Sequence, residues 1–159
     1  MSRLDSFIRR MQAQRLLIDH AGRAIADLGG PVLELGLGNG RTYHHLREKL
    51  PGRRIIAFDI KVTAQPDSVP ACEDLVLGDI QETARGFVGC GAALVHADLG
   101  SGVVERDEET LSWLPPLVPM LLAQGGLAVS DLPLDHPHLL KLPLPEGVAE
   151  GRYRLYRRR

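Results

Sequence analysis

The feature that most constrains how this chain can fold is a glycine-rich turn between two regular segments. The stretch ELGLGNG at residues 34–40 follows an apolar run from Val32 and precedes a helical pattern that starts at Thr42. Glycines permit positive φ and carry no Cβ atom that would keep a ligand away from the backbone. The free N–H groups of the next helix attract a carboxylate or a phosphate. The turn therefore predicts a binding site at a strand–helix junction.

Short apolar runs alternate with amphipathic stretches along the rest of the chain. Apolar side chains spaced by three and four residues predict helices at residues 3–28 (in one or two pieces), 42–50, 81–88 and 108–124. Three prolines, at 115, 116 and 119, should break or kink the last helix. Apolar runs predict strands at residues 32–37, 54–60, 74–79, 92–98, 126–130, 138–144 and 153–158. This alternation predicts an α/β fold in which helices cover both faces of a mostly parallel, twisted sheet.

Bulk composition fits one folded domain and excludes several functional classes. The 159 residues are 44% apolar and carry a formal net charge of −1, so no global field draws the protein to nucleic acid or to an anionic membrane. Two cysteines are too few for a disulfide framework and lack metal-ligand spacing. No apolar stretch suits a signal peptide or a membrane span. We expect a cytoplasmic protein of one domain, with a helical segment at 1–30 and an α/β core at 31–159, and the sequence leaves self-association open.

Carboxylates mark the ends of most predicted strands. Asp59, Asp79, Asp98 and Asp131 each end or directly follow a strand. Right-handed crossovers bring the carboxyl ends of parallel strands to one rim, where open α/β sheets bind ligands. Together with the glycine turn, these residues define the candidate site.

The glycine spacing distinguishes two classes of nucleoside cofactor. A dinucleotide site needs G-x-G-x-x-G, but Arg41 or Tyr43 occupies the sixth position in the two available registers. The chain instead has E-x-G-x-G-x-G, and in this motif it resembles the class I S-adenosylmethionine-dependent methyltransferases. Asp59, the Gly78-Asp79-Ile80 segment and the Gly125-Gly126 turn match further motifs of that family, so that the resemblance spans residues 32–131.

The resemblance implies a Rossmann-like class I methyltransferase fold closed by a C-terminal antiparallel hairpin. It implies S-adenosyl-L-methionine as cofactor, with Gly36, Gly38 and Gly40 at the methionine moiety and Glu34 orienting its ammonium group. Asp59 would accept hydrogen bonds from the ribose diol. The family's pattern also implies a group of residues around the adenine and the reacting centre: Ile60, Asp79, Ile80 and Asp98. Simpler structural roles are a core position for Ile60 and a helix N-cap for Asp79.

Methyl transfer requires a base only where the acceptor must lose a proton. The candidates at the rim are Asp98, His96, His136 and His138. His96 alternates with Asp98 and shares its face of the strand, although a hydrogen-bonded core histidine is the simpler interpretation. His136 and His138 lie in a proline-flanked loop, where surface histidines are common.

Two patterns that would define the acceptor or a metal are not met. Asp98 and Asp131 end nearby strands, as do the metal ligands of catechol-type O-methyltransferases, but Leu132 stands where that group has an amide. We therefore predict no metal. The tetrapeptide of amino-methylating nucleic-acid enzymes is replaced by Ala97-Asp98-Leu99-Gly100, which argues against DNA amino groups as acceptors. The arginines between 152 and 159 fit a charged, protected edge strand better than a nucleic-acid site.

The sequence thus predicts a methyltransferase that acts on a small-molecule or unidentified acceptor. Two alternatives remain: a catalytically silent module that binds the cofactor for regulation or assembly, and a nicotinamide-dependent oxidoreductase. The N-terminal helix is expected to cover the cofactor, and the core is expected to fold without residues 1–20.

Overall fold

A computed structural model of the chain, described here for residues 2–159, contains one seven-stranded mixed sheet. The strand order is β3-β2-β1-β4-β5-β7-β6. The strands are β1 (Val32–Leu35), β2 (Ile55–Asp59), β3 (Leu75–Leu77), β4 (Ala92–Ala97), β5 (Leu122–Ser130), β6 (Leu139–Leu142) and β7 (Arg154–Arg158). The first five run parallel, while β7 is antiparallel to both of its neighbours. The predicted α/β class and C-terminal antiparallel hairpin are confirmed.

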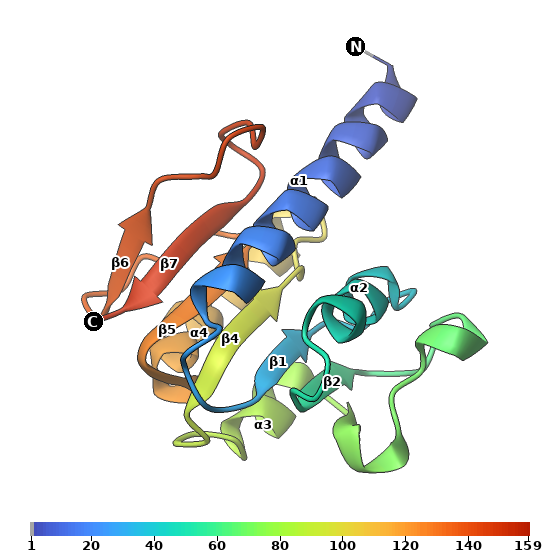
Figure 1. The fold of residues 1–159 in the computed structure, drawn as a ribbon. Helices are drawn as coiled ribbons and strands as arrows, with labels where there is room; N and C mark the ends of the chain where they lie inside the picture. The colour runs from blue at the N-terminus through green and yellow to red at the C-terminus, as the bar shows by residue number, and fades with distance from the viewer. Residues whose placement is uncertain (1) are drawn as a thin grey trace.

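Four helices cover the two faces of the sheet (Figure 1). The helices α1 (Arg3–Ala24) and α2 (Arg41–Lys49) pack on one face, where Leu17, Ile18 and Leu46 are buried. The helices α3 (Ile80–Arg85) and α4 (Val104–Leu121) pack on the other face, where Leu114 of α4 and Phe58 of β2 are buried. Each buried strand contributes side chains to the hydrophobic core on both faces of the sheet, because successive side chains point to opposite faces.

The long helix α1 has two halves with different surroundings. Its N-cap is Ser2, whose hydroxyl oxygen accepts a hydrogen bond from the Asp5 N–H, while the Asp5 side chain accepts one from the Ser2 N–H, so that the two form a capping box. Its second half buries Leu17 and Ile18 completely, whereas Leu4 and Phe7 in the first half are largely exposed. Figure 1 shows this first half extending past the sheet on the side of the strands' carboxyl ends. The helix is one piece, and it ends four residues before the predicted limit.

The helix that precedes β5 begins and ends earlier than the sequence pattern predicts, which was residues 108–124. The helix α4 begins at Val104, continues without a break through Pro115, Pro116 and Pro119, and ends at Leu121. Proline in a helix interior removes a hydrogen bond and costs about 3 kcal/mol, but buried Leu114, Leu117, Val118 and Leu121 hold the helix against the sheet. The strand β5 starts at the next residue, four positions before the predicted start. Two short 3₁₀ turns, η1 (Pro66–Ser68) and η2 (Cys72–Asp74), were not predicted.

The arginine-rich last strand is not at the edge of the sheet. The strand β7 lies between β5 and β6, and β6 is the edge strand, so the expectation of a charge-protected edge at residues 153–158 is wrong. Two of the arginines form hydrogen bonds to backbone carbonyl groups at the ends of β5: Arg154 donates to the Asp131 carbonyl and Arg158 to the Leu122 carbonyl. Within residues 2–159, none of the helices has the length and apolarity needed to cross a membrane.

Candidate functional site

A cleft of about 460 Å³ opens at the carboxyl ends of β1, β2 and β4. The glycine turn forms its floor, and the loop Asp98–Gly100 forms one wall. The projecting half of α1 forms an adjoining wall through Phe7, Arg10, Met11 and Gln14. The Arg41 guanidinium, from α2, lies 5.6 Å from the centre of the Phe7 ring and ties the two helices together over the cleft. The volume lies within the usual range for small-molecule sites.

The three glycines of the turn have positive φ but different surroundings. A Cβ atom on Gly38 would meet nothing within 4 Å, so here the backbone is open to the cleft. A Cβ atom on Gly36 would lie 3.0 Å from the Leu99 side chain, and one on Gly40 would lie 2.5 Å from the Ser68 Cβ. Gly36 and Gly38 line the cleft, whereas Gly40 lies against the segment around η1 and does not line it.

Asp59 emerges at the end of β2 beside the glycine turn, as its place in the sequence predicts. Its Oδ2 accepts a hydrogen bond of 2.8 Å from the Gly38 N–H, and its Oδ1 accepts one of 2.7 Å from the Ile60 N–H. The carboxylate lines the cleft and retains lone pairs on both oxygens. Asp59 therefore shapes the turn and presents acceptors to a ligand.

Beneath the rim, Glu34 and His96 form a fully buried pair on β1 and β4. The His96 Nδ1 lies 2.8 Å from the Glu34 Oε2, and the Thr42 hydroxyl donates to the Glu34 Oε1. Burial by itself lowers the pKa of His96, but the carboxylate of Glu34, with Asp98 and Asp131 further away, raises it overall. The His96 Nε2 has no hydrogen-bond partner among the described residues. Neither Glu34 nor His96 lines the cleft, and Thr42 is the member of this group that does.

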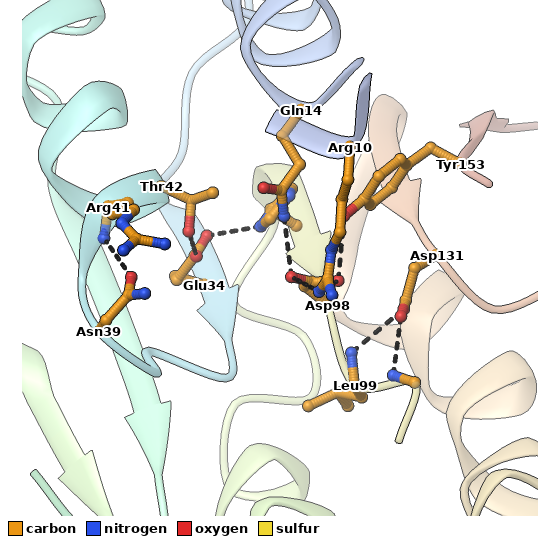
Figure 2. Close-up of polar contacts among 12 residues, drawn as sticks. Arg10, Gln14, Glu34, Asn39, Arg41, Thr42, Asp98, Leu99, Asp131 and Tyr153 are labelled. Atoms are coloured by element: carbon orange, nitrogen blue, oxygen red, sulfur yellow. Dashed lines mark hydrogen bonds and ion pairs between the residues drawn. The ribbon is translucent and has the colours of Figure 1, made fainter. Parts of the chain in front are cut away.

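Asp98 is held by three side chains from distant parts of the chain (Figure 2). The Arg10 Nη2 donates to both carboxylate oxygens, at 2.9 and 2.7 Å, and the Gln14 Nε2 donates to Oδ2 at 2.8 Å. The Tyr153 hydroxyl donates to Oδ1 at 3.2 Å and accepts from the Arg10 Nε. These partners occupy the carboxylate, so Asp98 organises the cleft wall and is poorly placed to take a proton.

Sequence reasoning missed Arg10, Gln14 and Tyr153. Arg10 and Gln14 stand four residues apart on α1, on the same side as the buried Leu17 and Ala21. A polar pair that continues an apolar helix face was the available signal. Tyr153 offered none, because its contact with Asp98 joins residues 55 positions apart.

Asp131 follows β5 and lies beside the Asp98 loop. Its Oδ1 accepts from the Leu99 N–H at 3.1 Å and its Oδ2 from the Gly100 N–H at 2.8 Å, as Figure 2 shows. Burial and, to a lesser extent, the neighbouring Asp98 carboxylate raise the pKa of Asp131 to about 6, against the opposing effect of the two backbone N–H groups. This carboxylate is half-buried and has no cationic side chain bonded to it.

The remaining predicted residues divide between the cleft and other surfaces. Ile80 lines the cleft, and Ile60 is 70% exposed, which excludes the core position for Ile60. Asp79 caps α3 by accepting from the Glu82 N–H at 3.1 Å and does not line the cleft. The structure brings neither His136 nor His138 to the cleft, because both line a separate hollow beside α4 and β7. Among residues 2–159, no group of three or more His, Cys, Asp or Glu side chains is placed to hold a metal ion.

Comparisons with known proteins agree with this architecture. A family model described as S-adenosyl-L-methionine methyltransferase matches residues 1–158. The crystal structure of an S-adenosyl-L-methionine methyl transferase from Silicibacter pomeroyi DSS-3 is 48% identical, with a TM-score of 0.92 and coverage of 99% of both chains. The apo structure of CalS11, described as a TDP-rhamnose 3'-O-methyltransferase of calicheamicin biosynthesis, is 25% identical with a TM-score of 0.57 and covers 98% of this chain and 83% of its own.

A more distant structure shares the fold alone. Cofactor-bound Rv0187 from MTB is 18% identical, with a TM-score of 0.61, over 92% of this chain and 79% of that one. A search of curated protein sequences gave no match.

Proposed function

The chain belongs to the S-adenosyl-L-methionine methyltransferase family, and from this premise we propose that it binds S-adenosylmethionine in the cleft under α1 and transfers the methyl group to a small-molecule acceptor. The observation that carries the proposal is the pairing of Gly38 with Asp59. The backbone at Gly38 is open to the cleft, and the Asp59 carboxylate stands next to it with free lone pairs. A nucleoside with a ribose diol and a charged tail needs both features.

The residues that would hold the cofactor come from four elements. Gly36 and Gly38 would allow the methionine moiety to approach the backbone, and Asp59 would accept hydrogen bonds from the ribose hydroxyls. Ile60 and Ile80 present apolar side chains for the adenine, and the capped N-terminus of α3 at Asp79 supports that side. Glu34 would act through Thr42, which it holds at the cleft wall.

When bound, the cofactor supplies a methyl group on a positively charged sulfur, which makes the carbon reactive without covalent help from the protein. The chain has to orient the acceptor and exclude water. The projecting half of α1 suits the second task, because Phe7 and Met11 cover the cleft with apolar surface. The Arg10–Asp98 pair fixes one wall of the cleft, and the reacting centre would lie next to it.

Two observations favour a small molecule as the acceptor. Within residues 2–159 no inserted segment is large enough for a substrate domain, and the rim contains two small adjoining cavities that share Arg10 and Gly100. The similar enzyme CalS11, whose description names a sugar hydroxyl, supports an oxygen acceptor. A cytoplasmic location remains a prediction.

The proposal is tested by ligand-linked stability and by turnover. S-adenosylhomocysteine at a hundredfold excess over its Kd should stabilise the protein by about 2.7 kcal/mol and raise the Tm by about 5–10 °C, whereas NAD should leave the Tm unchanged. Transfer of labelled methyl groups from S-adenosylmethionine to a metabolite panel would then establish catalysis. Binding without any transfer would support a silent cofactor-binding module, and a shift with NAD alone would overturn the proposal.

A further inference from the structure

A second, smaller cavity lies next to the cofactor cleft. It has a volume of about 220 Å³, and it shares Arg10 and Gly100 with the cleft as a common boundary. Asp131, Tyr153, Arg152 and Asp107 contribute its polar lining. A cavity that opens beside a cofactor cleft in this way is a candidate site for the molecule to be methylated.

The backbone holds the carboxylate of Asp131 at the boundary between the two cavities. Each oxygen accepts one hydrogen bond, from the Leu99 N–H or the Gly100 N–H, and each keeps a lone pair. The position depends on Gly100, because a Cβ atom there would lie 2.3 Å from the Asp131 Oδ2. The residue type at position 100 therefore leaves room for the carboxylate at this point.

The other two carboxylates nearby are occupied. Asp107 accepts hydrogen bonds from the Ser101 N–H, the Ser101 hydroxyl and the Gly102 N–H, and these lower its pKa. Asp98 is bonded to Arg10, Gln14 and Tyr153. Asp131 accepts hydrogen bonds from two backbone N–H groups, has no cationic side chain bonded to it, and neighbours the Asp98 carboxylate. Its carboxylate is therefore the most available proton acceptor in this part of the described chain.

We propose that the cavity between the Asp98–Gly102 loop and Tyr153 is the acceptor site, that Asp131 is the general base, and that the acceptor is a small hydroxy acid. The proposal rests on the function proposed above. It assigns the proton-accepting role to a residue outside the set expected from the sequence, which comprised Asp98, His96, His136 and His138.

The chemistry balances without a further reactant. The acceptor's oxygen forms a bond to the methyl carbon, and the bond between that carbon and sulfur breaks with its electron pair remaining on sulfur. The hydroxyl proton passes to the Asp131 carboxylate as the new bond forms. A pKa close to neutrality suits this carboxylate to accept a proton and release it to solvent afterwards.

The charge of the acceptor follows from the arginines of the cavity. Arg10 is paired with Asp98, whereas Arg152 donates to the Ser6 hydroxyl oxygen and forms no ion pair within residues 2–159. Arg152 is exposed at the mouth of the cavity, where its guanidinium can bind a carboxylate. An acceptor with a hydroxyl at one end and an anionic group at the other fits both Asp131 and Arg152.

The test uses three hydroxy acids, lactate, glycolate and salicylate, together with their neutral amides, lactamide, glycolamide and salicylamide. Binding is measured calorimetrically to the full chain loaded with S-adenosylhomocysteine, and turnover is measured with labelled S-adenosylmethionine. We expect at least one acid to bind and to be methylated at least tenfold better than its amide. Equal binding of acids and amides, or no binding by any of the six, would show the assigned substrate class to be wrong.

Two variants separate the roles of the cavity residues on the best acceptor. Asp131→Asn should lower kcat at least a hundredfold with little change in KM, as loss of a general base does. Arg152→Gln should raise KM about tenfold and change kcat little. The matched control is Asp135→Asn, which removes an exposed carboxylate from the same loop and should retain wild-type kcat. An Asp131→Asn enzyme with undiminished kcat would overturn the assignment of the base.

The pH profile adds a readout that a structural role would not change. The wild-type kcat should rise as Asp131 loses its proton near pH 6, and this limb should be absent in Asp131→Asn. The other charged or titratable groups around Asp131 all remain in the variant; they are Arg10, His96, Asp98, Asp107, Arg152, Tyr153 and Arg154. If Asp131→Asn does not unfold cooperatively, a second variant, Gly100→Ala, replaces it in the test. This variant keeps the Asp131 carboxylate but displaces it, and it should show the same loss of kcat. Normal turnover by Gly100→Ala would contradict the proposal.

The two proposals fail in distinguishable ways. If S-adenosylhomocysteine does not bind and no methyl group is transferred, the proposed function is wrong and the acceptor site falls with it. If S-adenosylhomocysteine binds but the acids do not, only the acceptor assignment is wrong.

Discussion

Asp59 connects the glycine turn to the end of the neighbouring strand. Its carboxylate accepts from two backbone N–H groups, one of them at Gly38, and lines the cleft at the same time. The residue therefore has a structural role and a proposed binding role, and the two should be separable by substitution.

Asp59→Ala should weaken binding of S-adenosylhomocysteine roughly ten- to a hundredfold, because each hydrogen bond to a charged group contributes about 1.5–3 kcal/mol. It should also lower the free energy of unfolding by about 1–3 kcal/mol, since the two N–H groups lose their acceptor. Asp59→Asn should fall between the wild type and Asp59→Ala in affinity. Titration calorimetry and urea unfolding measure the two effects, and equal affinities for all three proteins would exclude a ribose contact.

The buried pair of Glu34 and His96 leads to a prediction about how the stability of the protein depends on pH. The raised pKa of His96 means that the folded state binds this proton more tightly than the unfolded chain, whose value is near 6.5. The stabilisation is complete below that value and is lost as the pH rises through the folded-state pKa. Stability of the wild type should thus fall as the pH rises above about 6.5, the value of the unfolded chain.

His96→Phe should remove this pH dependence and lower the free energy of unfolding by about 3–5 kcal/mol, because Glu34 is left buried with only Thr42 as partner. Urea unfolding of both proteins at several pH values gives the comparison. A wild-type curve with the same pH dependence as the variant would mean that His96 is neutral in the folded protein.

At the scale of elements, α1 is divided between core and site. Leu17 and Ile18 in its second half are fully buried, so the structure argues against the expectation that the core folds without residues 1–20. Phe7 and Met11 in its first half belong to the cleft. The binding contribution of the helix is therefore confined to its first three turns.

The double variant Phe7→Ala/Met11→Ala should weaken binding of S-adenosylhomocysteine about tenfold or more and leave the Tm of the free protein within a few degrees, because each side chain covers the cleft and not the core. The matched control is Leu4→Ala/Ile8→Ala on the same helix, where both side chains are largely exposed and neither lines the cleft. Similar affinities for the two double variants would show that α1 does not cover the cofactor.

The elements also show where local pattern predicts structure well and where it does not. The strand through Val32, the glycine turn and Asp59 were predictable, because strand, turn and helix are adjacent in sequence and each has its own signal. The course of α4 was not, because its prolines oppose the helix locally and only packing against β4 and β5 holds it. The insertion of β7 between β5 and β6 has no local signal either, since periodicity does not encode the order of strands.

At the scale of the whole molecule, both ends of the described chain meet at one carboxylate. Arg10 lies on α1 and Tyr153 precedes β7, 143 residues apart, yet they bond to each other and to Asp98. The network could not be read from sequence, because every one of its contacts depends on the completed fold. The strand β7 also supplies Leu155 and Tyr156 to the core and pairs with two strands.

A chain that ends after Gly151 should therefore fail to fold cooperatively. It lacks Tyr153 and the whole of β7, and this leaves β5 with an unpaired edge and β6 without a partner. The control ends after Arg158 and loses only one exposed residue. Far-UV circular dichroism during urea unfolding should show a single transition for the control and none for the shorter chain, and a cooperative transition in the shorter chain would contradict the prediction.

The position of β7 between β5 and the edge strand β6 affects the order in which the sheet is completed during synthesis. The ribosome synthesises β6 before β7. Since β7 lies between β5 and β6 in the finished sheet, β6 cannot join the sheet until β7 has been made. Residues 154–158 must then enter between two strands that already exist, and only this step brings Tyr153 to Asp98. A polypeptide whose translation stops early would lack a complete sheet and the Tyr153 contact at the cleft wall together, so an interrupted product is exposed to proteolysis.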